Sequence, residues 1–271
     1  MLKGLVKATV QKGARSLGVV VTKPGGMYRE WEPITISRFF RLYDIELVLD
    51  IGANAGQYAT MLRERVEYNG RIVSCEPNPQ LADRLRRQSA ADDRWSIEHC
   101  AVSREPGTAT LNITASDEMS SLATPTSEET NVLMDHAKVV GSVDVPCTTV
   151  DALIETHGKG ARQGSIYVKS DTQGWEESVV AGMRSNFDLI SCIQMELSFK
   201  KIYENAWSYE QAISRMSGLG FELAALIPNN AGHFPFLIEM DGIFRNTRLP
   251  IETELRRDLA RTLAKISRPI P

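Results

Sequence analysis

The sequence contains no long apolar run and no excess of positive charge. None of its stretches reaches the roughly 18 consecutive apolar residues that a membrane-spanning helix requires. The formal net charge is −3 at pH 7, so the composition indicates no basic surface for nucleic acid. We therefore expect neither a transmembrane segment nor a nucleic-acid partner.

Cysteine and histidine are both scarce, with four of each in 271 residues. The cysteines have neither the spacing of a zinc site nor the density of a disulfide scaffold. His136 and His157 likewise offer no spacing that suggests a metal. We expect no metal site and a reducing, cytoplasmic location for four buried free thiols, which are Cys75, Cys100, Cys147 and Cys192.

From residue 47 onward, short apolar strands alternate with helices. Such alternation predicts an α/β fold with a mostly parallel sheet, helices on both faces and a ligand site at the carboxyl ends of the strands. The last two expected strands have no helix between them, which fits a final strand inserted antiparallel. The expected strands are 47–51, 71–75, 96–100, 166–171, 190–197, 221–227 and 236–244, and the expected helices are 57–67, 79–88, 175–184 and 208–218.

Three segments lie outside this alternation. Residues 1–44 predict a helical extension before the main domain of 45–250. An insert around 108–148 carries two expected strands and a polar stretch rich in Ser and Thr, which we interpret as a mobile element near the functional site. Residues 251–271 predict an amphipathic helix that is either structural or part of a homodimer contact.

The N-terminal extension alternates basic and apolar residues. Lys3, Lys7, Lys12 and Arg15 are interspersed with leucines and valines, but no continuous apolar core of a signal peptide is present. The pattern favours an amphipathic helix that packs on the domain, and a peripheral membrane contact is the alternative. A further helix, 33–43, is expected directly before the first strand.

The segment Val48-Leu-Asp-Ile-Gly-Ala-Asn-Ala-Gly-Gln-Tyr58 predicts a strand, a tight turn and a helix. Gly52 and Gly56 let the backbone approach a nucleotide-like ligand closely. Asn54 stands where the dinucleotide fingerprint G-x-G-x-x-G has its middle glycine. Asp50 disfavours a pyrophosphate and suits the cationic methionine end of S-adenosylmethionine, so we interpret this turn as a methyl-donor site.

A second carboxylate follows at the end of the next expected strand. Glu76 lies 26 positions after Asp50, near the roughly 20-residue spacing of an acid that holds ribose hydroxyls. One carboxylate can accept hydrogen bonds from both hydroxyls of a diol. The alternative is that Glu76 only caps the helix expected from residue 79.

The segment Val168-Lys-Ser-Asp-Thr-Gln-Gly-Trp-Glu176 repeats the strand–turn–helix pattern. In a parallel sheet both turns open on one edge, so we expect Asp171 to face the cofactor and to serve in catalysis, unless it merely caps the next helix. We add Glu196, at a strand end, and His233, in a loop, as candidate catalytic groups because each can accept a proton. Pairing of Glu196 with Lys200 or Lys201 is the alternative for that residue.

Taken in order along the chain, these motifs resemble the FkbM-type S-adenosylmethionine-dependent methyltransferases. Further matching segments are His99-Cys-Ala-Val-Ser103, Ser120-Ser-Leu122, Val145-Pro-Cys-Thr-Thr-Val-Asp151, Gln194-Met-Glu-Leu197 and Met240-Asp-Gly-Ile-Phe244. The resemblance covers roughly residues 45–245. It implies a class I methyltransferase (Rossmann-like) sheet of seven strands with the cofactor across its carboxyl edge.

The resemblance also implies positions for the donor. By position, Asp50, Gly52, Asn54, Gly56 and Glu76 line the donor site and Ala101 lies near adenine; Tyr58 and Pro77, which end two of the motifs, complete the predicted set. Asp171 and Glu176 stand in the K-x-D-x-x-G-x-E segment of the family. Ser170 departs from the pattern, because the family usually has an aliphatic residue there.

The function expected from this resemblance is O-methylation of a sugar hydroxyl in a glycolipid or polysaccharide. O-methylation of a polyketide or macrolide hydroxyl is an alternative within the same family. A nicotinamide oxidoreductase is disfavoured by Asn54. A binding module that keeps the donor fold without turnover is the alternative from a different class.

Overall fold

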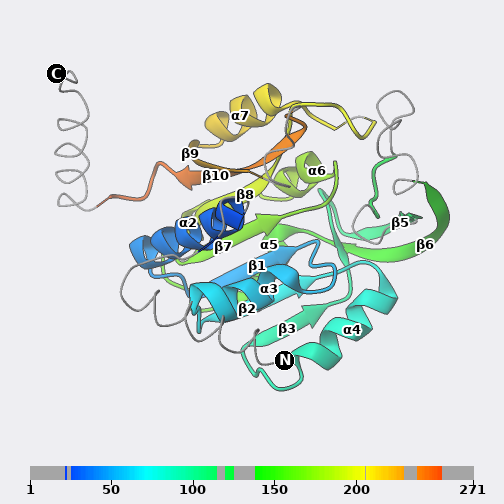
Figure 1. Cartoon of the computed structure of the whole chain (residues 1–271), viewed down its shortest axis with the longest axis horizontal. Helices are drawn as coiled ribbons and strands as arrows, with labels where there is room; N and C mark the ends of the chain where they lie inside the picture. Colours follow the sequence, from blue (N-terminus) through cyan, green and yellow to red (C-terminus); the bar gives the residue numbers. More distant parts are fainter. Residues whose placement is uncertain are drawn as a thin grey trace.

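The alternating strands and helices assemble into one seven-stranded sheet in the order β3-β2-β1-β7-β8-β10-β9 (Figure 1). The computed structural model describes residues 22, 26–114, 120–124, 138–204, 206–228 and 237–251. Neighbouring strands are parallel except where β10 pairs antiparallel with β8 and β9. The predicted mostly parallel α/β sheet is confirmed, including its antiparallel last strand. The strands are β1 Leu47–Ile51, β2 Arg71–Cys75, β3 Trp95–Glu98, β7 Ile166–Ser170, β8 Ile190–Ser198, β9 Phe221–Pro228 and β10 Glu239–Asn246.

Helices cover both faces of this sheet, because its central strands carry apolar side chains on both sides. On one face, Leu49, Val168 and Ile193 pack against α5, α6 and α7. On the other, Val48 and Tyr167 pack against α2, α3 and α4. The helices are α2 Met27–Tyr43, α3 Gln57–Met61 with a π-helical turn Leu62–Val66, α4 Pro79–Ser89, α5 Val150–His157, α6 Glu176–Ala181 and α7 Tyr209–Gly218.

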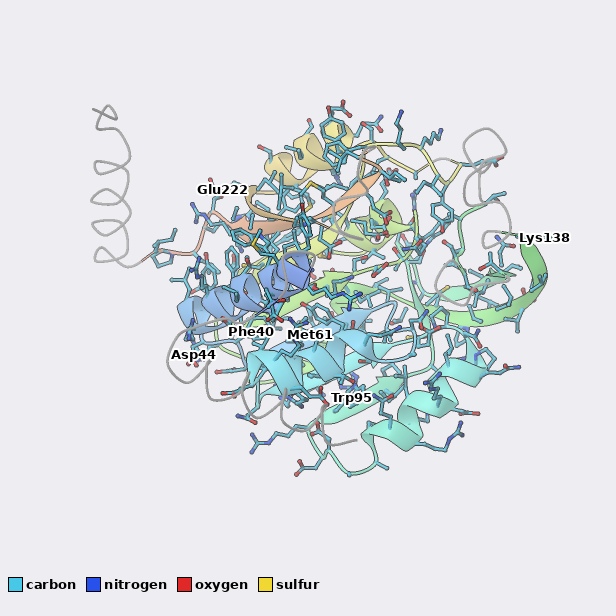
Figure 2. The ribbon with its side chains drawn as sticks, viewed as in Figure 1. Phe40, Asp44, Met61, Trp95, Lys138 and Glu222 are labelled. Carbon is cyan, nitrogen blue, oxygen red and sulfur yellow. The ribbon has the colours of Figure 1, made fainter. Side chains whose placement is uncertain are left out.

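Helix α2 begins earlier than the sequence indicates, at Met27 instead of Pro33. A proline inside a helix removes the hydrogen bond to the carbonyl four residues earlier. Here that carbonyl, on Arg29, accepts a hydrogen bond from Arg65 Nη2 at 2.6 Å. Further along α2, Phe40 makes edge-to-face contacts with the Tyr68 and Tyr167 rings, and Figure 2 labels it between α2 and the sheet. These contacts dock α2 on the sheet despite its proline.

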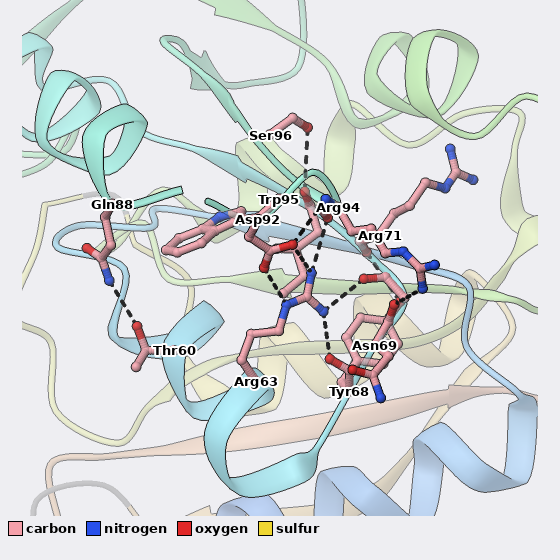
Figure 3. A network of polar contacts seen from close by, with 12 residues as sticks. Thr60, Arg63, Tyr68, Asn69, Arg71, Gln88, Asp92, Arg94, Trp95 and Ser96 are labelled. Atoms are coloured by element: carbon pink, nitrogen blue, oxygen red, sulfur yellow. Dashed lines mark hydrogen bonds and ion pairs between the residues drawn. The ribbon is translucent and has the colours of Figure 1, made fainter. Parts of the chain in front are cut away.

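An arginine anchors the end of the helix that follows the first glycine turn. Arg63 donates to the Asp92 carboxylate and to the Tyr68 and Gly70 carbonyls (Figure 3). These partners lie before β2 and before β3, so Arg63 ties the π-helical turn to both strands. These contacts fix the end of the helix that begins at the glycine turn.

The segment expected as an insert forms a second, three-stranded sheet in the order β4-β6-β5. It extends from one side of the main sheet (Figure 1). Strand β6 pairs parallel with β4 and antiparallel with β5. The strand expected at 96–100 is found at Trp95–Glu98, because the chain leaves the main sheet after Glu98 and enters β4 at Ala101. The strands are β4 Ala101–Val102, β5 Gly107–Thr114 and β6 Val139–Thr148.

The turns that follow β1 and β7 touch through their backbones. The amide of Asp171 donates to the Ile51 carbonyl at 2.9 Å. Gly52 has φ +79°, and a Cβ added there would lie 1.8 Å from the Asp171 carbonyl oxygen. Both conformation and space therefore require glycine at this position.

We predict that Gly52→Ala lowers the free energy of unfolding by about 2 kcal/mol or more, because it combines backbone strain with a backbone collision. Urea denaturation would measure the difference. Gly141→Ala is the matched control, since a Cβ there meets nothing within 4 Å. Equal stability of the two variants would show that the two turns separate without cost.

Candidate functional site

The first glycine turn curls over the end of β2. The amides of Gly52 and Ala53 both donate to the Cys75 carbonyl, at 3.0 and 3.1 Å. Asn54 adopts φ +49° and Gly56 φ +80°, conformations that asparagine and glycine tolerate better than other residues. A Cβ on Gly56 would press on Leu85 and Trp95. The turn is thus a defined loop at the carboxyl edge of the sheet.

Glu76 fixes this loop from the neighbouring strand. Its Oε2 accepts the Asn54 amide at 2.7 Å and its Oε1 accepts the Asn78 amide at 2.8 Å. The cap of α4 is the Asn78 side chain, which accepts the Gln80 amide, so Glu76 does not have the capping role considered from the sequence. Glu76 therefore ties the glycine loop to the segment that enters α4.

Asp50 lies one strand position before the loop, fully buried between β1 and β2. Its Oδ2 accepts a hydrogen bond from Ser74 Oγ at 2.8 Å, and that hydroxyl in turn accepts from Trp95 Nε1. Burial raises the pKa of Asp50 to about 6, although the Ser74 hydrogen bond and the Lys169 charge oppose it. A cation near the loop would favour the ionised form of Asp50.

Asp171 stands at the end of β7 with its carboxylate held on both sides. Lys169 Nζ donates to its Oδ2 and Gln173 Nε2 to its Oδ1, each at 3.0 Å. Burial works to raise the pKa of Asp171, but the Lys169 ammonium and the Gln173 amide lower it below the ordinary value. Its side chain remains 39% exposed. Asp171 is therefore an oriented, ionised carboxylate with access to a ligand, and it does not cap α6.

Gln173 joins Asp171 to Glu196. Its Nε2 also donates to Glu196 Oε2 at 3.0 Å, and its Oε1 accepts the Tyr203 hydroxyl at 2.9 Å. Burial, together with the Asp171 and Glu239 charges, raises the pKa of Glu196 well above its ordinary value. The two predicted catalytic carboxylates thus share one amide and differ in acidity. No pattern in the sequence indicates this role of Gln173, whose backbone has a φ of +54°.

A buried glutamine, Gln194, connects the site with helix α2. Its Oε1 accepts the hydroxyls of Tyr58 and Tyr167, at 3.0 and 2.9 Å. Its Nε2 donates to Glu32 at 3.0 Å and to Asp241 at 2.6 Å. All four hydrogen-bonding positions of the amide are occupied, so Gln194 is a fixed junction of four elements.

Lys169 supplies the positive charge next to these groups. It is 4% exposed, and its Nζ lies 5.6 Å from the centre of the Tyr58 ring. Burial would lower its pKa, but the carboxylates of Asp171, Asp241 and Glu196 raise it above the ordinary value. One ammonium therefore faces three acids, and the cluster has a surplus of negative charge.

The polar stretch of the insert and the segment that follows β8 approach the turn after β7. Ser121 Oγ lies 2.9 Å from the Thr172 carbonyl and 2.8 Å from that of Gln173. Tyr203 packs with Ala123 and Ile202, and its ring fills the space that a Cβ on Gly174 would take. The described parts of 115–140 and 198–207 thus border Asp171. The rest of those segments, like loop 229–236, lies outside the described residues.

The remaining predicted residues lie in different surroundings. Pro77 follows Glu76, and its carbonyl is 3.0 Å from His99 Nε2. Ala101 is buried on β4 with Leu111 and Val145. Glu176 accepts two hydrogen bonds from Thr172, which fixes the turn. His233 lies outside the described residues.

Two further observations concern chemistry that the sequence left open. In the described part of the chain, no three His, Cys, Asp or Glu side chains are grouped so that they could hold a metal ion. Ser170, which departs from the family pattern, points its Oγ into a buried environment where the described residues offer it no hydrogen-bond partner. Its hydroxyl therefore does not take part in the contacts around Asp171.

Comparisons with known proteins show which family has a sequence of this kind. The model of the family described as "Methyltransferase FkbM domain" matches residues 50–223. No curated protein matches the chain. Among solved structures, the methyltransferase FkbM from Methylobacillus flagellatus KT is similar at 14% identity and a TM-score of 0.47, over 74% of this chain and 44% of that one. This chain therefore spans less than half the length of that protein.

Two other similar structures contain S-adenosylmethionine. One is magnesium protoporphyrin IX methyltransferase from Synechocystis PCC 6803, at 8% identity and a TM-score of 0.42, over 81% of this chain and 80% of that one. The other is fibrillarin from Aeropyrum pernix, at 11% identity and a TM-score of 0.43, over 81% and 76%. These likenesses are distant, so the family model over residues 50–223 is the match that carries weight.

The raised pKa values predict how stability depends on pH. Burial and the Asp171 charge raise the pKa of Glu239 from 4.5 to about 7, and that of Asp50 rises from 3.8 to about 6. The folded chain therefore binds more protons than the unfolded chain between about pH 4 and about pH 7, and its stability falls as the pH rises through that range. We expect Glu239→Gln to remove part of this slope, on the order of 1 kcal/mol, in urea titrations at pH 5 and pH 8. Glu155→Gln, on the exposed side of α5, is the control, and an unchanged slope in Glu239→Gln would contradict the assignment.

Proposed function

Because this chain belongs to the FkbM methyltransferase family, we propose that it transfers a methyl group from S-adenosylmethionine to a hydroxyl oxygen of a sugar in a glycolipid or polysaccharide. One observation carries the proposal. The glycine loop held by Glu76 and the oriented carboxylate Asp171 meet at one sheet edge, with Gly52 packed directly on the Asp171 backbone. The loop would hold the donor, and the carboxylate of Asp171 stands at the same edge, where it could act on the acceptor hydroxyl.

The chemistry of the loop residues fits this donor. A carboxylate can accept hydrogen bonds from both hydroxyls of a diol such as ribose, and the Asn54 and Asn78 amides hold the carboxylate of Glu76 in place. Asp50 and the surplus of negative charge around Lys169 favour a cationic sulfur and an ammonium group. In this proposal the donor is held by Asp50, Gly52, Asn54, Gly56, Tyr58, Glu76, Pro77, Ala101 and Asp171.

The residues of the chain perform two tasks in this reaction. When bound, S-adenosylmethionine supplies a methyl group activated by a positively charged sulfur. The protein must orient the acceptor oxygen in line with the bond that breaks, which is worth several kcal/mol, and it must receive the hydroxyl proton. The transferred proton ends on a carboxylate, and the acceptor oxygen gains the methyl group.

Asp171 and Glu196 are suited to different parts of that second task. Lys169 and Gln173 hold Asp171 ionised and oriented, so it directs the acceptor hydroxyl. Glu196 has the higher pKa, which makes its carboxylate the stronger base once a cation nearby favours ionisation. Gln173 donates hydrogen bonds to both carboxylates. A proton that binds to one carboxylate therefore changes the electrostatic potential at the other. His233 stays a predicted third catalytic group.

The partners follow from the same features. Ser121 and Tyr203 border the turn after β7, so in this proposal the segments that carry them lie beside the acceptor. A polyketide hydroxyl is the alternative acceptor, and a donor-binding module without turnover is the alternative function. We place the protein in the cytoplasm, because its four cysteines are free and three of them are buried. A homodimer contact through 251–271 stays a prediction, since all but the first of these residues lie outside the described part.

We predict that the purified protein binds S-adenosylhomocysteine and not NAD⁺ in calorimetric titrations. Glu76→Ala should abolish this binding, because it removes the acceptor for the ribose hydroxyls and releases the Asn54 amide. Glu98→Ala, at the end of the adjacent strand, should leave binding unchanged. Preference for NAD⁺ would overturn the methyltransferase proposal and leave only the fold.

We predict that Asp171→Asn retains S-adenosylhomocysteine binding and loses methyl transfer by about 10²–10⁴-fold. Transfer to a panel of glycolipid and polysaccharide acceptors, followed with a labelled methyl group, would measure the loss. Asp144→Asn, on β6, is the control. Full transfer by Asp171→Asn together with a loss in Glu196→Gln would assign the proton acceptor to Glu196 alone.

A further inference from the structure

Large apolar side chains are exposed at the start of α2 and the end of β9. Met27 is 63% exposed, Tyr28 41%, Trp31 50% and Leu226 39%. Trp31 Nε1 donates to the Leu226 carbonyl at 3.2 Å, so these elements form one surface, which we call the α2 patch. A cluster of this kind on a protein surface marks an interaction site more often than single exposed residues do.

The α2 patch lies at the same edge of the sheet as the candidate active site. Strand β9 runs parallel to β8, because both pair antiparallel with β10, so Leu226 lies near the carboxyl edge. Glu32, adjacent to Trp31, accepts a hydrogen bond from Gln194 inside the site. A surface that covers the patch therefore borders the edge of the sheet at which the candidate site lies.

The sequence that leads into the patch has a charge pattern of its own. It contains six basic residues and no Asp or Glu before Glu30, although the whole chain has a net charge of −3. The basic residues are Lys3, Lys7, Lys12, Arg15, Lys23 and Arg29.

We propose that the α2 patch and this basic segment dock the protein on an anionic lipid surface. Trp and Tyr have an apolar ring with a polar group, which suits the headgroup boundary of a bilayer. Clustered Lys and Arg are attracted to anionic lipids, and the apolar residues next to them enter the boundary. A second copy of this chain is disfavoured as the occupant, because it would bring two like-charged segments together. In the described part of the chain, no helix is long and apolar enough to cross a membrane, so docking is peripheral.

Docking at this edge brings the candidate site to the lipid surface. If the proposed methyl transfer is correct, on which this step rests, the acceptor is a glycolipid whose sugar projects from the membrane. The docking itself is a binding property and is measured without turnover.

The test uses the full chain with vesicles of phosphatidylcholine, with and without phosphatidylserine, in a sedimentation assay. We expect binding to the phosphatidylserine vesicles, at least ~10-fold weaker binding to phosphatidylcholine alone, and loss of binding at high salt. Met27→Ser with Tyr28→Ser should weaken binding by about 10-fold. Val140→Ser is the matched control, because Val140 is 62% exposed on β6, next to Lys138, which Figure 2 labels far from α2.

Tryptophan fluorescence gives a second readout. Of the four tryptophans, Trp31 is half exposed and Trp175 is partly buried, whereas Trp95 and Trp207 are buried. Binding should shift the emission to shorter wavelength, and Trp31→Phe should bind vesicles nearly as well without that shift. S-adenosylhomocysteine titration of each variant separates loss of docking from loss of the fold or of the donor site.

Several outcomes would overturn the proposal. Equal binding to both kinds of vesicle, or no binding, would do so, as would weakening by Val140→Ser as large as that by the patch variant. Binding of duplex DNA as tightly as of phosphatidylserine vesicles, unaffected by the patch variant, would assign the basic segment to a polyanion instead of a membrane.

Discussion

The parallel pairing of β1 with β7 is the constraint on which the site depends. It brings the carboxyl ends of two segments more than a hundred residues apart to the same edge, and the backbone contact between Gly52 and Asp171 then leaves no space between their turns. A side chain at Gly52 would collide with the Asp171 carbonyl and separate them. The loop suited to a nucleotide and the carboxylate suited to catalysis are therefore one rigid unit, and no hinge is needed to bring them together.

The charges at this edge are balanced for a cationic ligand. Lys169 is buried, yet its pKa is raised because three carboxylates surround it. Burial and mutual repulsion raise the pKa values of Asp50, Glu196 and Glu239. Ionisation of these carboxyl groups in the folded protein therefore lowers its stability. A sulfonium or ammonium group offsets that cost, so ligand binding stabilises the fold by mass action.

The sequence predicts the parts of this site that are local and misses those that are not. The geometry of the strand–turn–helix motifs around Gly52 and Asp171 follows from residues within each motif, because the glycines and the preceding apolar strand determine where the turn lies. Gln194 gives no such signal, since its partners lie 136 and 162 residues away on α3 and α2. The sequence also places the start of α2 too late. The carbonyl of Arg29, which loses its helical hydrogen bond to Pro33, is satisfied by Arg65, and that residue lies 36 positions away.

Helix α2 connects the interior of the site with the surface of the protein. Trp31 and Glu32 are adjacent, and successive helical residues point in directions about 100° apart. One side chain therefore faces solvent beside Leu226, while the next reaches Gln194 and, through it, Asp241 and Tyr58. Because Gln194 has no hydrogen-bonding position left unused, a shift of this helical turn must break a buried hydrogen bond, which is costly. The position of the exposed side of α2 and the position of Glu32 are therefore coupled. A partner that binds the start of α2 also stabilises the buried hydrogen bonds of Gln194 behind the carboxyl edge.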